Sequence, residues 1–367
     1  LIDSSSLSLL SRSLQTVAAV SVTLAMPLAA QDFKSRRVEI IVPYGPGGGS
    51  SIHGELFKEA LEKTLPGNPT IIMRNVPGAG SVKGINEFHA KAKPDGSTIG
   101  SIASGTFFSY LVQSPEVKYP LTEFKPFLAS PFGVIIYGRK NQAGGLGTDA
   151  VENIKKLQKT PGVYGGQNAI SSDMPALVAF HLLKIAPKTL FGVSNKELQG
   201  AFQRGEVTIN YDNMASYEEN VKPMFADGSA VPLFTFGFIS SDGKFVRDPA
   251  APEIPTFTEV YEKVTGKALS GVELDIWKAM MAVRVMASKA LVLPVGTPQK
   301  IVDTYSEAAR KAVEQLKKDP RAQTVLGAYP QLIGKDAENA VKAAADMTPA
   351  QRQWLRNWAK TVHNADF

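Results

Sequence analysis

The chain has 367 residues, of which 44% are hydrophobic and 20% are charged, the ordinary balance of a folded globular protein with room for two domains. Its formal net charge is +6, but the basic residues are spread along the chain without a zinc-finger or RNA-binding signature, so nucleic acid is not expected as a partner. The absence of cysteine excludes disulfides, thiolate metal sites and cysteine nucleophiles.

The N-terminal segment has the pattern of an export signal. The apolar stretch VAAVSVTLAMPLAA, residues 17–30, is preceded by Arg12, ends in small residues and is followed by polar QDFKSRR. Because this stretch is too short for a comfortable membrane span, we expect a signal peptide over residues 1–30, cleavage after Ala30 and a periplasmic protein. An N-terminus that stays anchored in the membrane is the alternative.

Strand and helix patterns alternate from residue 38 onward. The first strands are expected at residues 38–42, 70–74 and 98–103, with helices at 52–65 and 81–91. Units of this length predict a parallel sheet with helices on both faces. A break rich in proline and aromatic residues follows at residues 107–132.

The alternation resumes after this break, which indicates a second α/β domain. The expected strands are residues 134–137, 162–165, 207–211 and 231–236, and the helices are 150–159, 173–183, 197–204 and 216–226. The remainder is mostly helical, with amphipathic helices at 299–317 and 349–362. We expect one domain over residues 31–133 and 250–367, the other over 134–249, and crossings near 130–137 and 240–255.

Loops of glycine and small residues follow the first three strands. They are VPYGPGGGSS at residues 42–51, NVPGAGS at 75–81 and ASGT at 103–106. Helix N-termini carry unpaired amides and partial positive charge, and glycine lets a ligand approach the backbone, so such loops favour anion binding. The alternative is a tight turn that needs positive φ. Because parallel strands end at one edge of a sheet, we expect these loops to share a pocket facing GGQNAISSD and NYDNM of the second domain.

The motifs of common nucleotide-binding and hydrolytic sites are missing. Ser50 stands where a dinucleotide fingerprint has its third glycine, no lysine follows Gly49 as in a Walker loop, and no G-x-S-x-G occurs. The four histidines are isolated, and only His53 lies near the expected pocket. We therefore expect no metal, no cofactor and no catalytic set. Asp212, at the tip of a strand, could either bind a ligand or cap the next helix.

The order of these motifs resembles the periplasmic solute receptors of tripartite tricarboxylate transporters, the Bug or TctC-like receptors. The family patterns VPFxPGGxxD, ENRPGAGG and PDGYTL correspond here to VEIIVPYGPGGGSS, IIMRNVPGAGSVKG and KPDGSTIG. Further on, PEIPTFTEV resembles P-x-PTxxE, and PVGTPQKIVDTYSEAARKAV resembles PxGTPxxxVxxLN. The resemblance covers residues 37–330.

This resemblance implies a type II periplasmic binding protein, with two α/β domains around a ligand cleft joined by hinge crossings. It implies a monomer that binds a small organic carboxylate and delivers it to the membrane permease of a tripartite tricarboxylate transporter. The family binds through backbone amides and small polar groups. Carried over position by position, this implicates Tyr44, Gly48, Gly49, Ser50, Ser51, Ala79, Gly80, Ser81, Ser104, Thr106, Asn168, Ser171, Ser172, Asp212 and Asn213.

Four departures from the family pattern stand out. Ser51 replaces the family's aspartate, His53 replaces a small or aliphatic residue, Ser97 replaces the common aromatic residue after PDG, and IWKAMMAVRVMASKALVLPVGTP is an unusual approach to the GTP motif. Loss of an acid beside the pocket favours an anionic ligand. Two other functions remain open: an α/β enzyme acting on a small carboxylate or phosphate ester, and a ligand-sensing receptor for a signalling partner.

Overall fold

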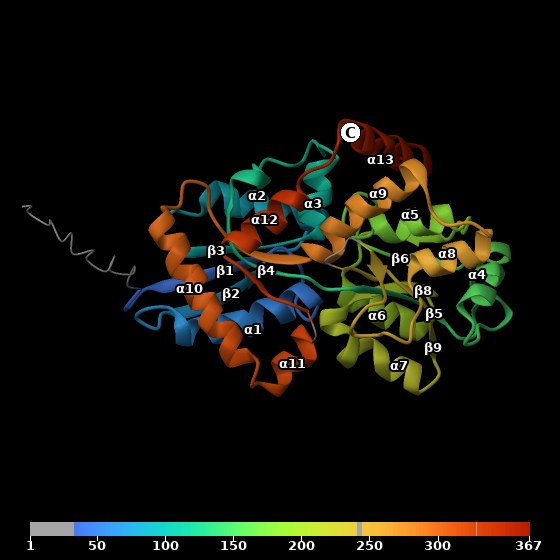
Figure 1. The fold of residues 1–367 in the computed structure, drawn as a ribbon, viewed down its shortest axis with the longest axis horizontal. Helices are drawn as coiled ribbons and strands as arrows, with labels where there is room; N and C mark the ends of the chain where they lie inside the picture. Colours follow the sequence, from blue (N-terminus) through green and yellow to red (C-terminus); the bar gives the residue numbers. More distant parts are fainter. Residues whose placement is uncertain (1–32, 241–243, 328) are drawn as a thin grey trace, which may run out of the picture.

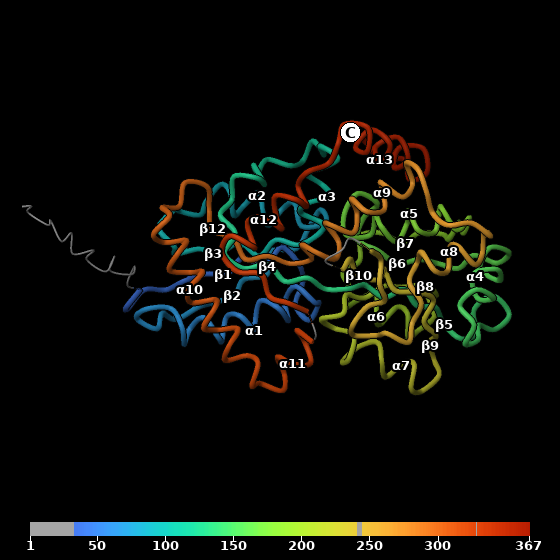
Figure 2. Tube along the Cα trace, in the orientation of Figure 1, coloured from blue at the N-terminus to red at the C-terminus, as the bar shows by residue number. Residues whose placement is uncertain are grey.

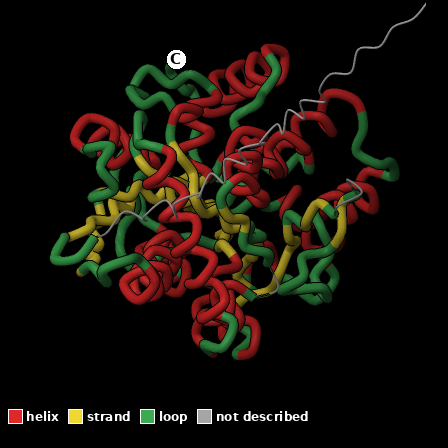
Figure 3. The backbone as a smooth tube through the Cα atoms, turned by 60° about the vertical axis from the view of Figure 1, so that its left-hand side comes forward, coloured by secondary structure: helices red, strands yellow, loops and turns green. Residues whose placement is uncertain are grey.

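The computed structural model describes residues 33–240, 244–327 and 329–367. Within these residues the chain forms two large sheets, which lie one after the other along the long axis of the molecule, and a short β-hairpin (Figure 1). The first sheet has the strand order β13-β4-β12-β3-β1-β2, and the second has the order β7-β6-β8-β5-β9. Strands lie inside and helices outside, as Figure 3 shows.

The first sheet is mixed. Strands β1, β2 and β3 are parallel. Strand β12, labelled beside β3 in Figure 2, runs antiparallel to both β3 and β4. Its strands are β1 (Arg37–Val42), β2 (Thr70–Asn75), β3 (Thr98–Ala103), β4 (Lys125–Ser130), β12 (Lys289–Leu293) and β13 (Leu332–Ile333). The helices around it are α1 (Gly49–Thr64), α2 (Val82–Lys91), α3 (Ser104–Leu111), α10 (Gln299–Leu316), α11 (Pro320–Leu326) and α12 (Lys335–Ala344).

The second sheet is also mixed, because β5 runs antiparallel to its neighbours β8 and β9. Its strands are β5 (Val134–Arg139), β6 (Val163–Gly165), β7 (Lys188–Leu190), β8 (Ile209–Asn213) and β9 (Ala230–Thr235). The helices around it are α4 (Ala150–Lys159), α5 (Met174–Leu182), α6 (Asn195–Arg204), α7 (Lys222–Ala226), α8 (Phe257–Thr265), α9 (Gly271–Met281) and α13 (Pro349–His363). The hairpin is β10 (Phe238–Ile239) with β11 (Phe245–Val246).

Buried side chains form one cluster on each face of the sheets. Along β5, Val134 and Ile136 join the cluster with α2, α3, α4, α5 and α12, and Ile135 and Tyr137 join the cluster with α1, α6 and α10. This alternation is the period of two that a strand with both faces covered requires. The hydroxyl of Tyr305 on α10 also donates to the carbonyl of Gly96 (2.5 Å), so the helix holds the turn KPDG in place.

The first three strands are parallel as predicted, but the prediction of a parallel sheet does not hold for the first sheet as a whole, which is mixed. Strand β12 lies in the middle of the first sheet in the antiparallel sense, because it enters from the side of the second sheet. Its sequence, KALVL, follows a helical segment directly, and so short an apolar run cannot be told from helix by periodicity. Strand β4 and helix α3 were likewise hidden in the stretch predicted as a break.

The chain first crosses between the sheets at residues 131–133, from β4 to β5. The chain returns to the first sheet only at β12. Before that, α8 packs against α4 and β9 of the second sheet, and α9 and the π-helical turn Ala282–Met286 then lead into β12. The predicted domain boundary at residue 250 stays a prediction, and the observed path places α8 beside the second sheet.

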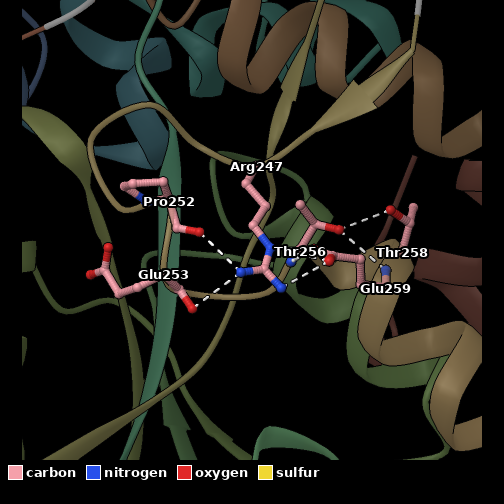
Figure 4. A network of polar contacts seen from close by, with 6 residues as sticks. All are labelled: Arg247, Pro252, Glu253, Thr256, Thr258 and Glu259. Atoms are coloured by element: carbon pink, nitrogen blue, oxygen red, sulfur yellow. Dashed lines mark hydrogen bonds and ion pairs between the residues drawn. The ribbon is translucent and has the colours of Figure 1, made fainter.

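The segment before α8 is fixed by a polar network (Figure 4). Arg247 donates to the carbonyls of Pro252 (3.0 Å) and Glu253 (3.4 Å) and pairs with Glu259 (Nη2–Oε1, 3.0 Å). The Thr256 hydroxyl accepts from the Glu259 amide (3.2 Å), and the Glu259 carboxylate accepts from the Thr256 amide (2.7 Å). This capping box is the structural reason for the P-T-x-x-E spacing in PEIPTFTEV.

In the described part of the chain, none of the helices has the length and apolar character that a membrane span needs. The expected signal peptide, residues 1–30, lies outside the described residues.

Candidate functional site

A cavity of about 50 Å³ lies where loops from the two sheets meet. From the first sheet come the loop after β1 and the first residues of α1 and α3, and from the second come residues on β8, α6 and the loop after β6. The lining residues are Tyr44, Gly45, Pro46, Gly48, Gly49, Ser50, Ala103, Ser104, Gln167, Ser172, Ser194, Asn195, Lys196, Tyr211, Asn213, Arg284 and Lys289.

A groove of about 940 Å³ adjoins this cavity. The two spaces share Tyr44, Gly45, Pro46, Gln167 and Ser194. The groove continues past the loop after β2, at Gly78–Gly80, and past Ile170 and Phe191 of the second sheet's side. A ligand can therefore place one end in the cavity and the rest in the groove.

The N-terminus of α1 forms one wall of the cavity. Gly48 precedes the helix in an extended conformation and provides no side-chain cap, so the first helical amides lack a side-chain acceptor. These amides and the helix dipole put partial positive charge at the wall. A Cβ atom at Gly49 would lie 3.5 Å from Lys289 Nζ and 3.4 Å from Asn213 Oδ1, which shows how closely the opposite wall approaches.

Two basic residues, Arg284 and Lys289, also line the cavity, and each is only 3% exposed. Lys289 Nζ donates to Asn213 Oδ1 (3.2 Å) and lies 5.2 Å from the ring centroid of Phe132. The Arg284 guanidinium lies 5.3 Å from the ring centroid of Tyr211. Burial lowers the pKa of the Lys289 ammonium well below its ordinary value, and the charge of Arg284 lowers it further.

Two buried carboxylates lie close enough to feel the charge of Arg284, but both are engaged elsewhere. Asp212 accepts hydrogen bonds from Tyr137 (2.9 Å), Ser216 (3.0 Å) and Gln199 (3.3 Å). Burial raises its pKa to about 6, against the effect of these hydrogen bonds.

The second carboxylate, Asp173, accepts from the amides of Gln167 (2.9 Å) and Asn168 (3.2 Å) and from the hydroxyl of Tyr164 (3.0 Å). Burial raises its pKa as well. Neither acid lines the cavity, whose lining includes the basic residues Lys196, Arg284 and Lys289 and no carboxylate.

The structure brings most of the residues implied by the family resemblance to these two spaces. Those that line the small cavity are Tyr44, Gly48, Gly49, Ser50, Ser104, Ser172 and Asn213. Those that line the groove, besides Tyr44, are Ala79, Gly80 and Asn168. The predicted set therefore spans both walls, and its role as a ligand site stays a proposal.

Five residues of the predicted set line neither space, and each has a structural partner instead. Ser81 Oγ bonds Thr106 Oγ1 (3.0 Å), Ser51 Oγ accepts from Asn75 (3.1 Å), and Ser171 donates to Asp173 (3.2 Å). The fifth is Asp212, which alternates along β8 with the cavity-lining Tyr211 and Asn213 and therefore points to the opposite face. The cap of the turn after β8 is Asn213.

Sequence reasoning missed both buried cations. The available signal was the occurrence of Arg284 and Lys289 inside the apolar run AMMAVRVMASKALVL. A basic residue is seldom buried without a partner, so its presence in such a run indicates a binding or pairing role. The nearby His53 does not line the cavity. It is buried in α1, its Nε2 lies 2.8 Å from Ser130 Oγ, and burial lowers its pKa well below the ordinary value.

Comparison with known proteins identifies the family. No family model matches the chain. Over 327 residues, which are 85% of this chain and 87% of the relative, it is 31% identical to protein BugT of Bordetella pertussis. The chain belongs to the Bug family of receptors. This receptor is also 25% identical, over 82% of its length and 83% of the relative's, to a UPF0065 protein of the same species.

Solved structures share the fold of this Bug receptor. The periplasmic binding protein BugD matches with a TM-score of 0.65 at 18% identity, over 89% of this chain and 97% of that one. MatC from Rhodopseudomonas palustris, solved with bound malate, matches with a TM-score of 0.60 at 21% identity, over 89% and 99%. A third protein, from R. palustris and solved with adipate, gives 0.65 at 18% identity, over 90% and 99%. The predicted periplasmic binding protein fold is confirmed.

Proposed function

We propose that this Bug receptor is exported, binds a small organic carboxylate between its two sheets and delivers it to the membrane permease of a tripartite tricarboxylate-type transporter. The observation that carries the proposal is the positively charged cavity at the meeting of the two sheets. The family relationship supports delivery to a permease, and the malate and adipate held by proteins of the same fold support the ligand class.

The cavity offers hydrogen-bond donors from both sides to one acid group. The amides at the start of α1 and the hydroxyl of Ser50 face it from the first sheet, and the hydroxyl of Ser172 faces it from the second. Hydrogen bonds from neutral and charged donors to a carboxylate are among the stronger ones in proteins. Binding between two lobes selects the closed arrangement, with the hinge in the crossing segments.

The residues around the cavity support a receptor rather than an enzyme. In the described part of the chain, two acids and a histidine near the cavity are engaged outside it: Asp173 and Asp212 in hydrogen-bond networks, and His53 with Ser130. What faces the cavity is a set of donors and cations, which can hold an anion.

The proposed export rests on the apolar segment at residues 17–30. N-terminal sequencing of protein from the bacterial periplasm should begin at or near Gln31. Soluble cytoplasmic protein that retains residues 1–30 would contradict export.

Calorimetric titration with mono-, di- and tricarboxylates and aromatic acids tests the ligand class. At least one acid should bind the parent. In Gly49→Val the added methyl groups should enter the cavity beside Asn213 and Lys289 and abolish binding. Gly147→Val is the matched control, because nothing lies within 4 Å of a Cβ at that exposed glycine.

Each variant is first checked for native circular dichroism and an unchanged melting temperature without ligand. A parent that binds no acid of the panel would overturn the carboxylate class. A folded Gly49→Val that binds as well as the parent would show that the glycine loop is only a turn.

A further inference from the structure

Arg284 and Lys289 are basic side chains removed from water that form no salt bridge among the described residues. Both are 3% exposed, and both line the small cavity. The Nε atom of Arg284 is buried and has no hydrogen-bond partner among the described residues, and none of the salt bridges found there includes either side chain. A buried charge is costly unless it is paired, so this pair calls for an anion that the chain itself does not supply.

The lining of the small cavity contains no carboxylate. Asp173 and Asp212 are held by hydrogen bonds from other residues, and Lys289 donates to the neutral amide of Asn213. A third cation, Lys196 on α6, also lines the cavity. The N-terminus of α1 adds partial positive charge. One carboxylate would leave much of this charge unpaired.

We propose that Arg284 and Lys289 form a cationic subsite for an acidic head group that carries two negative charges. This inference rests on the proposed function and names the ligand more closely. The head group is either a pair of carboxylates on neighbouring carbons or a phosphoryl group, because both present several anionic oxygens within a small volume. An arginine fork and a lysine point charge suit such oxygens.

The dimensions limit the head group to a compact one. A cavity of about 50 Å³ accepts little more than the charged end, and the remainder extends past Tyr44 and Gln167 into the groove of about 940 Å³. Arg284 lies in the π-helical turn Ala282–Met286, a local distortion of a kind that often marks functional sites. A bound anion would also offset the burial that lowers the pKa of Lys289.

The test is calorimetric titration of the parent with butyrate, succinate and inorganic phosphate. Butyrate and succinate have the same number of carbon atoms and differ in the second carboxylate. We expect succinate or phosphate to bind at least about tenfold more tightly than butyrate, as loss of a hydrogen bond to a charged group implies. A preference for succinate identifies the dicarboxylate head group, and a preference for phosphate identifies the phosphoryl group.

Arg284→Gln and Lys289→Gln should each lower the affinity for the preferred dianion by about tenfold to a hundredfold and change butyrate affinity much less. Lys278→Gln, at an exposed position of α9, is the matched control and should change neither. If Arg284→Gln does not fold, Arg284→Lys keeps the charge and should keep part of the preference. The ratio of the parent's affinity for succinate or phosphate to its affinity for butyrate tests the dianion preference independently of any variant.

Equal affinity of the parent for butyrate and both dianions would overturn the cationic subsite. So would folded Arg284→Gln and Lys289→Gln proteins that keep the parent's dianion affinity. If the parent binds butyrate and the Gly49→Val variant does not, the proposed function still holds even when this inference fails. A receptor that binds phosphate but no carboxylate keeps the cationic subsite and loses the proposed ligand class, and a receptor that binds neither fails both.

Discussion

At the scale of single residues, Asp248 is a buried acid at the crossing between the sheets. Its side chain accepts hydrogen bonds from the Tyr329 hydroxyl and from the Ala250 amide (2.9 Å). Its Oδ2 atom is buried and has no hydrogen-bond partner among the described residues, and a Cβ at Gly133 would collide with that atom. Burial raises the pKa of Asp248 to about 6.

Asp248→Asn should therefore change the pH dependence of stability. The folded protein holds the Asp248 proton up to about pH 6, and the unfolded chain releases it near 3.8, so its stabilisation is complete below 3.8 and is lost as the pH rises through about 6. This difference in pKa corresponds to ~3 kcal/mol at neutral pH. Urea unfolding across this pH range should show a smaller decline in the variant than in the parent.

The exposed Asp275→Asn is the control for this measurement, because its carboxylate is open to solvent. An Asp248→Asn protein whose unfolding free energy follows pH as steeply as the parent's would contradict a raised pKa at this position.

Single residues also show what sequence reasoning can reach. Glycines and serines after the first strands predicted the backbone wall of the cavity, because unpaired helix amides and bare backbone have a direct local signature. The sequence did not reveal that Arg284 and Lys289 line the cavity, because their position depends on a π-helical turn and on the entry of β12 from the other sheet. Neither arrangement can be predicted from the spacing of apolar residues along the chain.

At the scale of elements, α8 begins at a capping box that is recognisable in the sequence from the T-x-x-E spacing of Thr256 and Glu259. Thr256→Ala removes the side-chain acceptor for the Glu259 amide and should lower the free energy of unfolding by about 1 kcal/mol. Thr258→Ala, two residues along, removes a hydroxyl contact to Thr256 but not the cap, and should cost less. Equal losses of stability in the two variants would argue against the cap as the source of the effect.

Long helices with a clear apolar face were predicted closely, whereas short strands were not. Helix α4 has the predicted bounds and α10 differs by one residue, because their buried faces repeat over several turns. Strand β12 has only five residues, all buried, and follows a helical run. Its strand conformation depends on pairing with β3 and β4, which lie far away in the sequence.

At the scale of the whole molecule, the two sheets meet at the loops that the motif order singled out. The lobes contact each other directly there, with Ser104 Oγ 3.5 Å from Ser172 Oγ and Asn213 donating to Ser288 (3.0 Å). The two buried cations lie in the segment that returns the chain to the first sheet. We infer that a ligand bound to them ties this crossing to both lobes and thereby favours closure.

The most direct test of this account is a crystal structure of the receptor with the acid selected by the titrations. The account predicts ligand density in the cavity between the sheets, with its acid group within hydrogen-bond distance of the α1 N-terminus. Density in another space would contradict it, in particular in the groove between α10 and α12 that Lys125, Arg310 and Lys335 line.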